Sequence, residues 1–168
     1  MIEKLRSKRG IIKAVLAICL VLTILYIMVD RSFEPMRTRQ IGTIQNYVLV
    51  LRNDLYNASN WDFEEAPVSR EAFMYRSQLW VEVLSEAFRN LALLYGGASG
   101  STDFPRFNLG TNLNYLFLHA DEPHEELRWI ADELMVLYER IDPTMPAWDL
   151  FDIVNETNAR LNARLPLR

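Results

Sequence analysis

Apolar residues form one long uninterrupted stretch near the start of the chain. Ala14 to Val29 is a run of sixteen uncharged and mostly apolar residues, AVLAICLVLTILYIMV. At a rise of about 1.5 Å per residue the run covers about 24 Å, and Ile11 and Ile12 extend it to about 28 Å, against a hydrocarbon core of about 30 Å. We therefore expect residues 11–30 to form a single transmembrane helix, with residues 11–29 in contact with the lipid bilayer.

From Arg37 to about Asn57 the pattern changes to apolar residues at steps of three and four, which places them on one face of a helix. This seam consists of Ile41, Ile44, Val48, Leu51 and Leu55. It covers about two heptads, too few for a long coiled coil, so we expect it to pack against helices of the same domain. The seam also leaves room for a homo-oligomer.

Pro35 stands between the apolar run and the seam. Proline lacks the N–H that a continuous helix needs and clashes with the preceding turn. We therefore expect residues 31–36 to be a juxtamembrane linker, with Pro35 as a joint and a new helix after it.

A second helix is predicted from Ser69 to Tyr95. Ser69 offers an N-cap, and Gly96 and Gly97 end the pattern. Its apolar residues are not confined to one stripe, since Leu79 and Val83 lie outside the main one. A helix that is apolar on several faces is expected to lie centrally in its domain.

Three further helices complete the prediction, and no segment has the alternation of a strand. One runs from about residue 108 to 120, although Gly110 weakens it. The next begins with Asp121 as its cap and Pro123 in its first turn, and it ends at Asp142. The last opens near Pro146. The predicted fold class is all-α: one N-terminal transmembrane helix, then an antiparallel extracytoplasmic bundle of four to five helices over residues 37–168.

Charge gives this arrangement a direction. The first thirteen residues carry one acid and five basic residues, namely Lys4, Arg6, Lys8, Arg9 and Lys13. By the positive-inside rule, residues 1–10 form a short basic cytoplasmic tail and the C-terminal domain is extracytoplasmic. Residues 31–168 carry 20 acidic and 13 basic side chains. Because so acidic a domain repels phosphate groups, we expect no nucleic-acid partner.

Processing and lipidation would change the membrane prediction, but neither fits the sequence. The segment after the apolar run, from Tyr26 to Ser32, lacks the pair of small residues that signal peptidase requires. Cys19 is the only cysteine, and Ile18 before it is not the small residue of a lipidation motif. The apolar run is therefore expected to remain as a signal anchor, and the domain to fold without an internal disulfide.

Candidate chemistry is sparse. The stretch HADEPHEE holds both histidines, so His119, Asp121 and His124 are the candidates for a metal-dependent hydrolase. The two histidines are five residues apart, whereas helical zinc ligands stand three or four apart, so we expect no metal, no cofactor and no enzyme. The segment from Gly96 to Phe107 is rich in glycine and serine. It lacks the setting of a nucleophile elbow or a phosphate loop, and the sequence leaves its role open.

Several aromatic residues fall in or beside the predicted connections rather than within helices. These are Trp61, Phe63, Phe104, Phe107 and Trp148. They would either close the ends of the bundle core or anchor a protein partner.

Three functions remain open. The first is a non-catalytic membrane-anchored module, an adaptor or assembly factor that docks a membrane or envelope protein. The second is an ectodomain that senses a small molecule and signals through a partner. The third is the metal-dependent hydrolase. The sequence favours the first, because the anchor and the seam are clear and the chemistry is weak.

Overall fold

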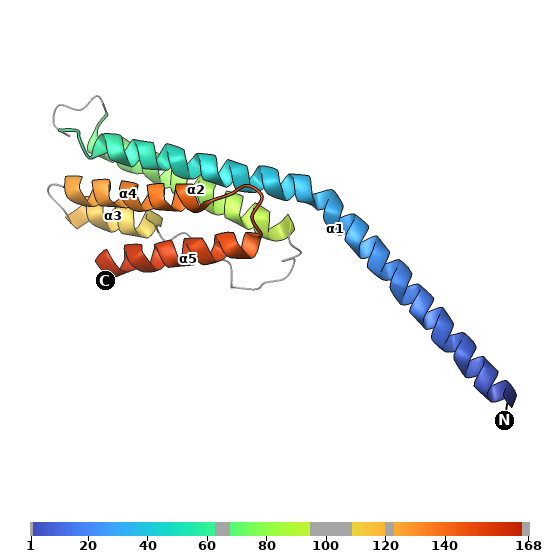
Figure 1. The fold of residues 1–168 in the computed structure, drawn as a ribbon. Helices are drawn as coiled ribbons and strands as arrows, with labels where there is room; N and C mark the ends of the chain where they lie inside the picture. Colours follow the sequence, from blue (N-terminus) through green and yellow to red (C-terminus); the bar gives the residue numbers. More distant parts are fainter. Residues whose placement is uncertain (1, 63–67, 95–108, 120–122, 166–168) are drawn as a thin grey trace. The chain divides into compact units, whose positions relative to one another are not determined.

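The computed structural model describes residues 2–62, 68–94, 109–119 and 123–165, without the side chains of residues 2–11, 14, 111 and 117–119. Over these ranges the chain is helical, with no strand (Figure 1). The five helices are α1 (Ile2–Ala58), α2 (Arg70–Leu94), α3 (Leu109–His119), α4 (His124–Arg140) and α5 (Ala147–Arg164). The prediction of an all-helical chain with a long apolar N-terminal helix is confirmed.

Helix α1 continues through Pro35, so the expectation that a new helix begins after this proline is wrong. The role of Pro35 as a joint stays a prediction. A proline inside a helix removes one hydrogen bond, here the one that would end on the carbonyl of Arg31, and the helix continues where the flanking residues favour it. The segment expected as a linker, residues 31–36, is helical.

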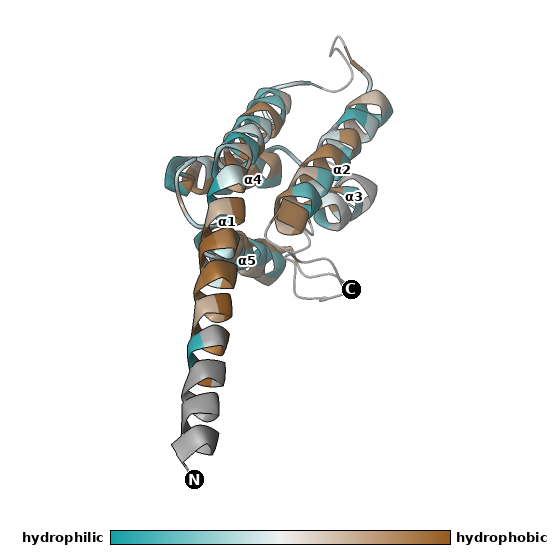
Figure 2. Ribbon diagram, turned by 90° about the vertical axis from the view of Figure 1, so that its right-hand side faces the viewer, coloured by the Kyte–Doolittle hydropathy of each residue, from teal (hydrophilic) through white to brown (hydrophobic). Residues whose placement is uncertain are grey.

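By its internal contacts the chain divides into two compact units, residues 1–36 and residues 37–168. In the first unit, every large apolar side chain from Val15 to Val29 is exposed, by between 47% and 72%. Figure 2 colours this part of α1 brown, the colour of apolar residues. Within the described residues, α1 is the one helix long and apolar enough to cross a membrane.

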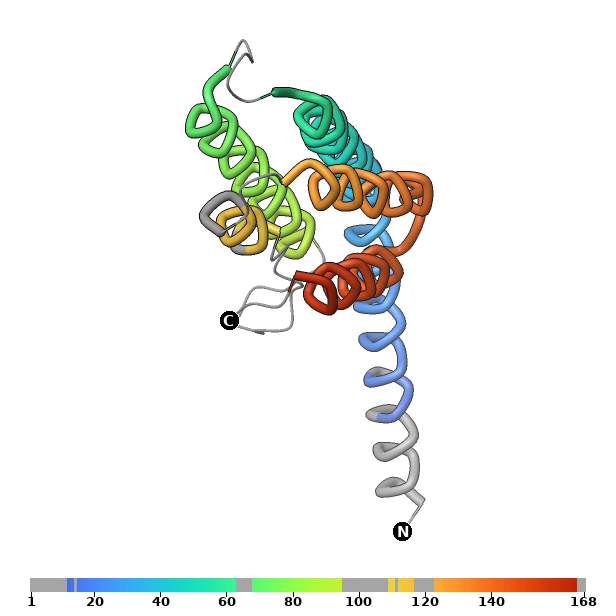
Figure 3. Tube along the Cα trace, turned by 90° about the vertical axis from the view of Figure 1, so that its left-hand side faces the viewer, coloured from blue at the N-terminus to red at the C-terminus, as the bar shows by residue number. Residues whose placement is uncertain are grey.

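The second unit is a ring of five helices, in which α1 takes part through residues 37–58. Helix α2 packs on α3, α3 on α5, and α5 on α4. Side chains of α1 close the ring, because Gln40 donates a hydrogen bond to a carbonyl of α2 and Gln45 donates to carbonyls of α4. Figure 3 shows the helices around a shared interior in the order α1, α2, α3, α5, α4.

The core of the second unit fills this interior. The five seam residues of α1 are all at most 1% exposed and pack there with apolar residues of the other helices. Its largest fully buried side chains are Phe73, Ile41, Ile44, Leu51, Leu55, Leu84, Leu91, Leu109, Leu113, Leu127, Ile130 and Leu134. Each such side chain stabilises the fold by about 1.5–3 kcal/mol relative to exposure, so the interior supplies most of the driving force for this unit.

The helix ends follow local chemistry, with one correction. The Oγ of Ser69 accepts a hydrogen bond of 3.2 Å from the backbone N–H of Ala72, as expected of an N-cap. Helix α4 begins at His124, with Pro123 at the N-cap position and no side-chain cap, so it starts later than expected. The expected cap, Asp121, lies outside the described residues.

Gly110 has a packing reason in the structure. A Cβ atom added at this position would lie 3.2 Å from Cγ1 of Val81 on α2. The absence of a side chain therefore lets α3 approach α2 closely.

Candidate functional site

Two of the five aromatic residues predicted as partner anchors are described. Trp61 is half-buried and packs edge-on against Phe73, with ring centroids 5.6 Å apart. Trp148 is 62% exposed and lies edge-on to Phe151 at 5.8 Å. Phe63, Phe104 and Phe107 lie outside the described residues, as does the whole segment from Gly96 to Phe107. The anchoring role of the five stays a prediction.

Of the three candidate metal ligands, only His124 has a described side chain, in the first turn of α4. Asp121 and the side chain of His119 are outside the described part of the chain. Among the side chains that are described, no group of three or more His, Cys, Asp or Glu residues could hold a metal ion.

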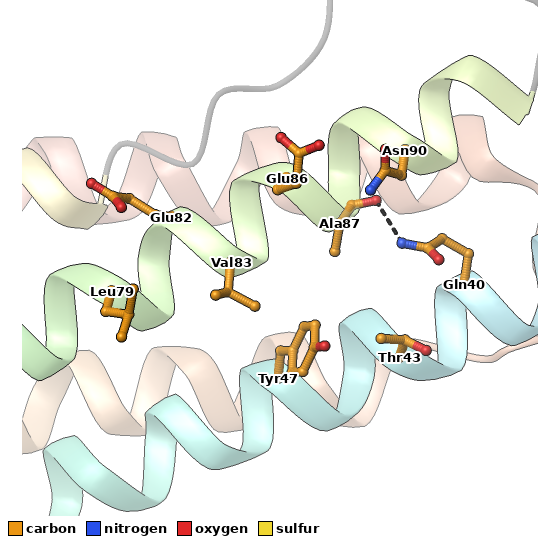
Figure 4. A pocket seen from close by; sticks show the side chains of 9 residues that line it. All are labelled: Gln40, Thr43, Tyr47, Leu79, Glu82, Val83, Glu86, Ala87 and Asn90. Carbon is orange, nitrogen blue, oxygen red and sulfur yellow. Dashed lines mark hydrogen bonds between the residues drawn. The ribbon is translucent and has the colours of Figure 1, made fainter.

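The second unit has a groove between α1 and α2, with a volume of about 530 Å³. We call it the α1–α2 groove (Figure 4). Its lining residues are Gln40, Thr43, Tyr47, Leu79, Glu82, Val83, Glu86, Ala87 and Asn90.

The groove exists because long side chains bridge α1 and α2. Near one end, Nε2 of Gln40 donates a 3.0 Å hydrogen bond to the carbonyl of Ala87. Further along, the rings of Tyr47 and Trp80 meet with their centroids 6.0 Å apart. These contacts span the space between α1 and α2, and the groove beside them is open to the outside.

Apolar side chains form the floor of the α1–α2 groove. In Figure 4 Val83 points from α2 toward Tyr47 of α1, and Leu79 lies one turn away. Leu79 is 49% exposed, which corrects the expectation that its extra apolar face makes α2 a central helix. These residues continue the apolar surface of the helix pair outward, beyond the core.

The α2 edge of the groove is acidic. Glu82 and Glu86 are both exposed, and Figure 4 shows their side chains on α2 at this edge. Glu86 pairs with Arg89 at 3.1 Å, but both side chains are half exposed or more, so the pair is weak. Glu82 and Glu86 stand four residues apart, a spacing at which like charges on a helix repel.

Side chains of α1 also hold the C-terminal ends of two neighbouring helices. Arg37 donates from Nε and Nη2 to the carbonyl of Leu94, at 3.2 and 3.0 Å. Gln45 donates from Nε2 to the carbonyl of Ile141 at 2.7 Å. Because the last carbonyls of a helix lack partners within it, these bonds fix where α2 and α4 end against α1.

Two carboxyl groups away from the groove have lowered pKa values. Hydrogen bonds from the backbone N–H and the hydroxyl of Thr144, both 2.8 Å, lower the pKa of Asp142 and form the turn after α4. A hydrogen bond and the positive charge of Arg140 lower the pKa of Glu156. The latter pair joins α4 to α5 at 2.6 Å. Both carboxyl groups are structural.

The groove residues were absent from the sites predicted from sequence, although the sequence holds a signal for them. Tyr75, Leu79, Glu82, Glu86 and Leu93 follow one another at steps of three, four or seven, which places them on one stripe of α2. On that stripe, two successive acids stand between apolar residues on either side. A stripe so mixed is neither a core face nor an ordinary solvated face.

A comparison of the chain with protein-family models, with curated proteins and with solved structures finds no match.

Proposed function

We propose that the protein is a membrane-anchored, non-catalytic helical module that docks a partner protein at the outer face of the membrane, as an adaptor or assembly factor. The observation that carries this proposal is the difference between the two units in how far their apolar side chains are buried. In one unit the large apolar side chains that the structure describes, from Ile12 to Val29, are exposed, whereas the other unit buries its own core.

The exposed apolar segment of α1 supports a membrane anchor. More than ten large apolar side chains between Val15 and Val29 are left in solvent, an arrangement that costs free energy in water and is favourable in a bilayer. The basic residues before this segment favour a cytoplasmic N-terminus. Residues 37–168 then lie on the extracytoplasmic side.

The contacts between α1 and α2 support an antiparallel bundle. Moving forward along α1 through Arg37, Gln40 and Tyr47, the partners on α2 move backward. The ion pair of Asp54 with Arg76 continues the trend at 3.1 Å. Such a bundle presents the sides of its helices as its main surfaces.

The form of the α1–α2 groove favours a protein partner over a small molecule. Small-molecule sites enclose most of the ligand surface. Here the lining includes the exposed side chains of Leu79, Glu82 and Glu86, so a small ligand would remain open to water on one side. A larger partner can cover the whole groove.

Crosslinking of cells that express the tagged full-length chain, followed by purification, tests this proposal. The expected result is one protein recovered in stoichiometric amount. As a control, a chain in which an unrelated single-span helix replaces residues 11–29 should recover the same protein, since docking belongs to residues 37–168. Recovery of the chain alone in repeated experiments would contradict the proposal.

A further inference from the structure

Three large apolar side chains are exposed on the outer stripe of α2. Tyr75, Leu79 and Leu93 are 70%, 49% and 56% exposed, and on α1 Val50 is 38% exposed. The stripe runs along the α1–α2 groove, whose lining includes Leu79. An exposed apolar stripe with polar residues at its edge is typical of an interaction surface.

We propose that the α1–α2 groove docks one amphipathic helix of a different protein, whose apolar side chains enter the groove and whose arginine or lysine side chains meet Glu82 and Glu86. This inference rests on the proposed docking function and names its surface and its partner.

The shape of the groove points to a helix as the occupant. The lining of α2 runs from Leu79 to Asn90, and the eleven steps between them rise by about 16 Å, or about three turns. A helix laid into a groove between two others inserts side chains at steps of three and four. Recognition by strand addition needs an exposed strand edge, and the described residues contain no strand.

The charge of the groove points to a basic partner. Glu82 and Glu86 repel each other at their four-residue spacing, and Arg89 only partly compensates. A cationic side chain placed between the two carboxylates would relieve this repulsion while it gains two attractive contacts.

The same acids disfavour a second copy of this chain as the occupant. In a two-fold dimer built on the groove, the same patch lies on both sides of the interface. Each copy would then bring its Glu82 and Glu86 into an interface that already holds the same two carboxylates of the other copy. A partner with the opposite charge avoids this cost.

The test uses a photo-crosslinking amino acid placed at Leu79 in the full-length chain in cells. The matched control carries it at Val136, an apolar residue of α4 that is 44% exposed and outside the groove lining. The inference expects an adduct from position 79 and none from position 136. Mass spectrometry should map the adduct to an amphipathic helical peptide with arginine or lysine beside its apolar residues.

Glu82→Arg then tests the charge. It should lower the yield of the adduct about tenfold, because attraction becomes repulsion. Glu139→Arg, at an exposed position of α4, should leave the yield unchanged. Glu82→Gln should lower the yield less than Glu82→Arg, and the unchanged helical signal of all three variants would show that folding is not the cause.

Three outcomes would overturn the inference. An adduct between two copies of this chain would make the groove a face between copies. An adduct to a peptide without basic residues, or one that Glu82→Arg does not weaken, would remove the charge argument. If position 79 gives no adduct while general crosslinking still recovers a partner, the groove is not the docking site, but the proposed docking function is not contradicted. If general crosslinking also recovers nothing, both fail.

Discussion

At the scale of single residues, two glycines within helices of the second unit have opposite surroundings. A Cβ atom at Gly110 would meet Cγ1 of Val81 at 3.2 Å. At Gly42, the nearest atoms to an added Cβ belong to Pro143 and lie 4.0 Å away, at ordinary van der Waals distance. The sequence alone could not separate them, because each is simply a weak helix former in a helical pattern. Only the packing of α3 on α2 shows that one glycine is needed.

Alanine at these two positions should therefore change stability in opposite directions. Gly42→Ala should raise the free energy of unfolding by about 0.5–1 kcal/mol, because alanine favours the helix. Gly110→Ala should lower it by about 1 kcal/mol, since the contact with Val81 costs more than the gain in helix propensity. Urea unfolding of the full chain in mild detergent, followed by tryptophan fluorescence, measures both. All four tryptophans, Trp61, Trp80, Trp129 and Trp148, lie in the second unit. Equal effects of the two substitutions would contradict the packing argument.

At the scale of helices, sequence patterns predicted where the helices lie better than they predicted where one helix ends and the next begins. The N-cap at Ser69 was predictable because a side-chain oxygen is a local signal. The continuity of α1 through Pro35 was not, because one lost hydrogen bond does not decide between a break and a continued helix. The α1–α2 groove was predictable only in part. The stripe that mixes Leu79 with Glu82 and Glu86 is visible in the sequence, but the side chains of α1 that complete the groove are known only from the packing of α1 beside α2.

The joint between α4 and α5 gives a prediction on pH. In the folded chain the pKa of Glu156 lies below its ordinary value of 4.5, chiefly because Arg140 donates a hydrogen bond to it. A lowered pKa means that the pair stabilises the fold above pH 4.5, and that this contribution disappears as the pH falls through the folded value. Glu156→Gln should thus be slightly less stable than the parent chain at pH 7.

The two proteins should become equally stable at a pH below the folded pKa of Glu156. Thermal unfolding across this range checks the expectation, and repetition in 1 M salt should narrow the difference at pH 7 because the pair is exposed to solvent. If the difference in stability between the parent chain and Glu156→Gln grows as the pH falls, the proposed contribution of the Arg140–Glu156 pair is contradicted.

At the scale of the whole molecule, the chain combines an apolar helical segment without a core and an acidic helical unit with one. The first was predictable from composition alone, because sixteen consecutive uncharged residues have few other uses. The interior of the second was predictable from the three–four pattern of its helices, as in the seam of α1. The surface of the second unit was not predictable in this way, because the helix pattern alone does not say which other helix packs against a given face.

A charge placed in the apolar segment should prevent membrane anchoring. Leu20→Arg puts a cation near the middle of the proposed span, which costs about 2.5–3.5 kcal/mol on insertion. We expect a larger share of this variant to be released from membranes by alkaline carbonate. Val136→Arg, which adds the same charge to the second unit, should stay in the membrane fraction. Equal release of both variants would argue against the anchor.

Site-specific cysteine labelling in intact cells tests whether one membrane span displays residues 37–168 at the outer face of the membrane. In a Cys19→Ala background, Asp152→Cys places a thiol at an exposed position of α5, and Ser7→Cys places one before the apolar segment. With a membrane-impermeant maleimide, we expect the cysteine at 152 to react in intact cells and the cysteine at 7 to react only after permeabilisation. Labelling of position 7 but not of position 152 in intact cells would reverse the topology and contradict the account.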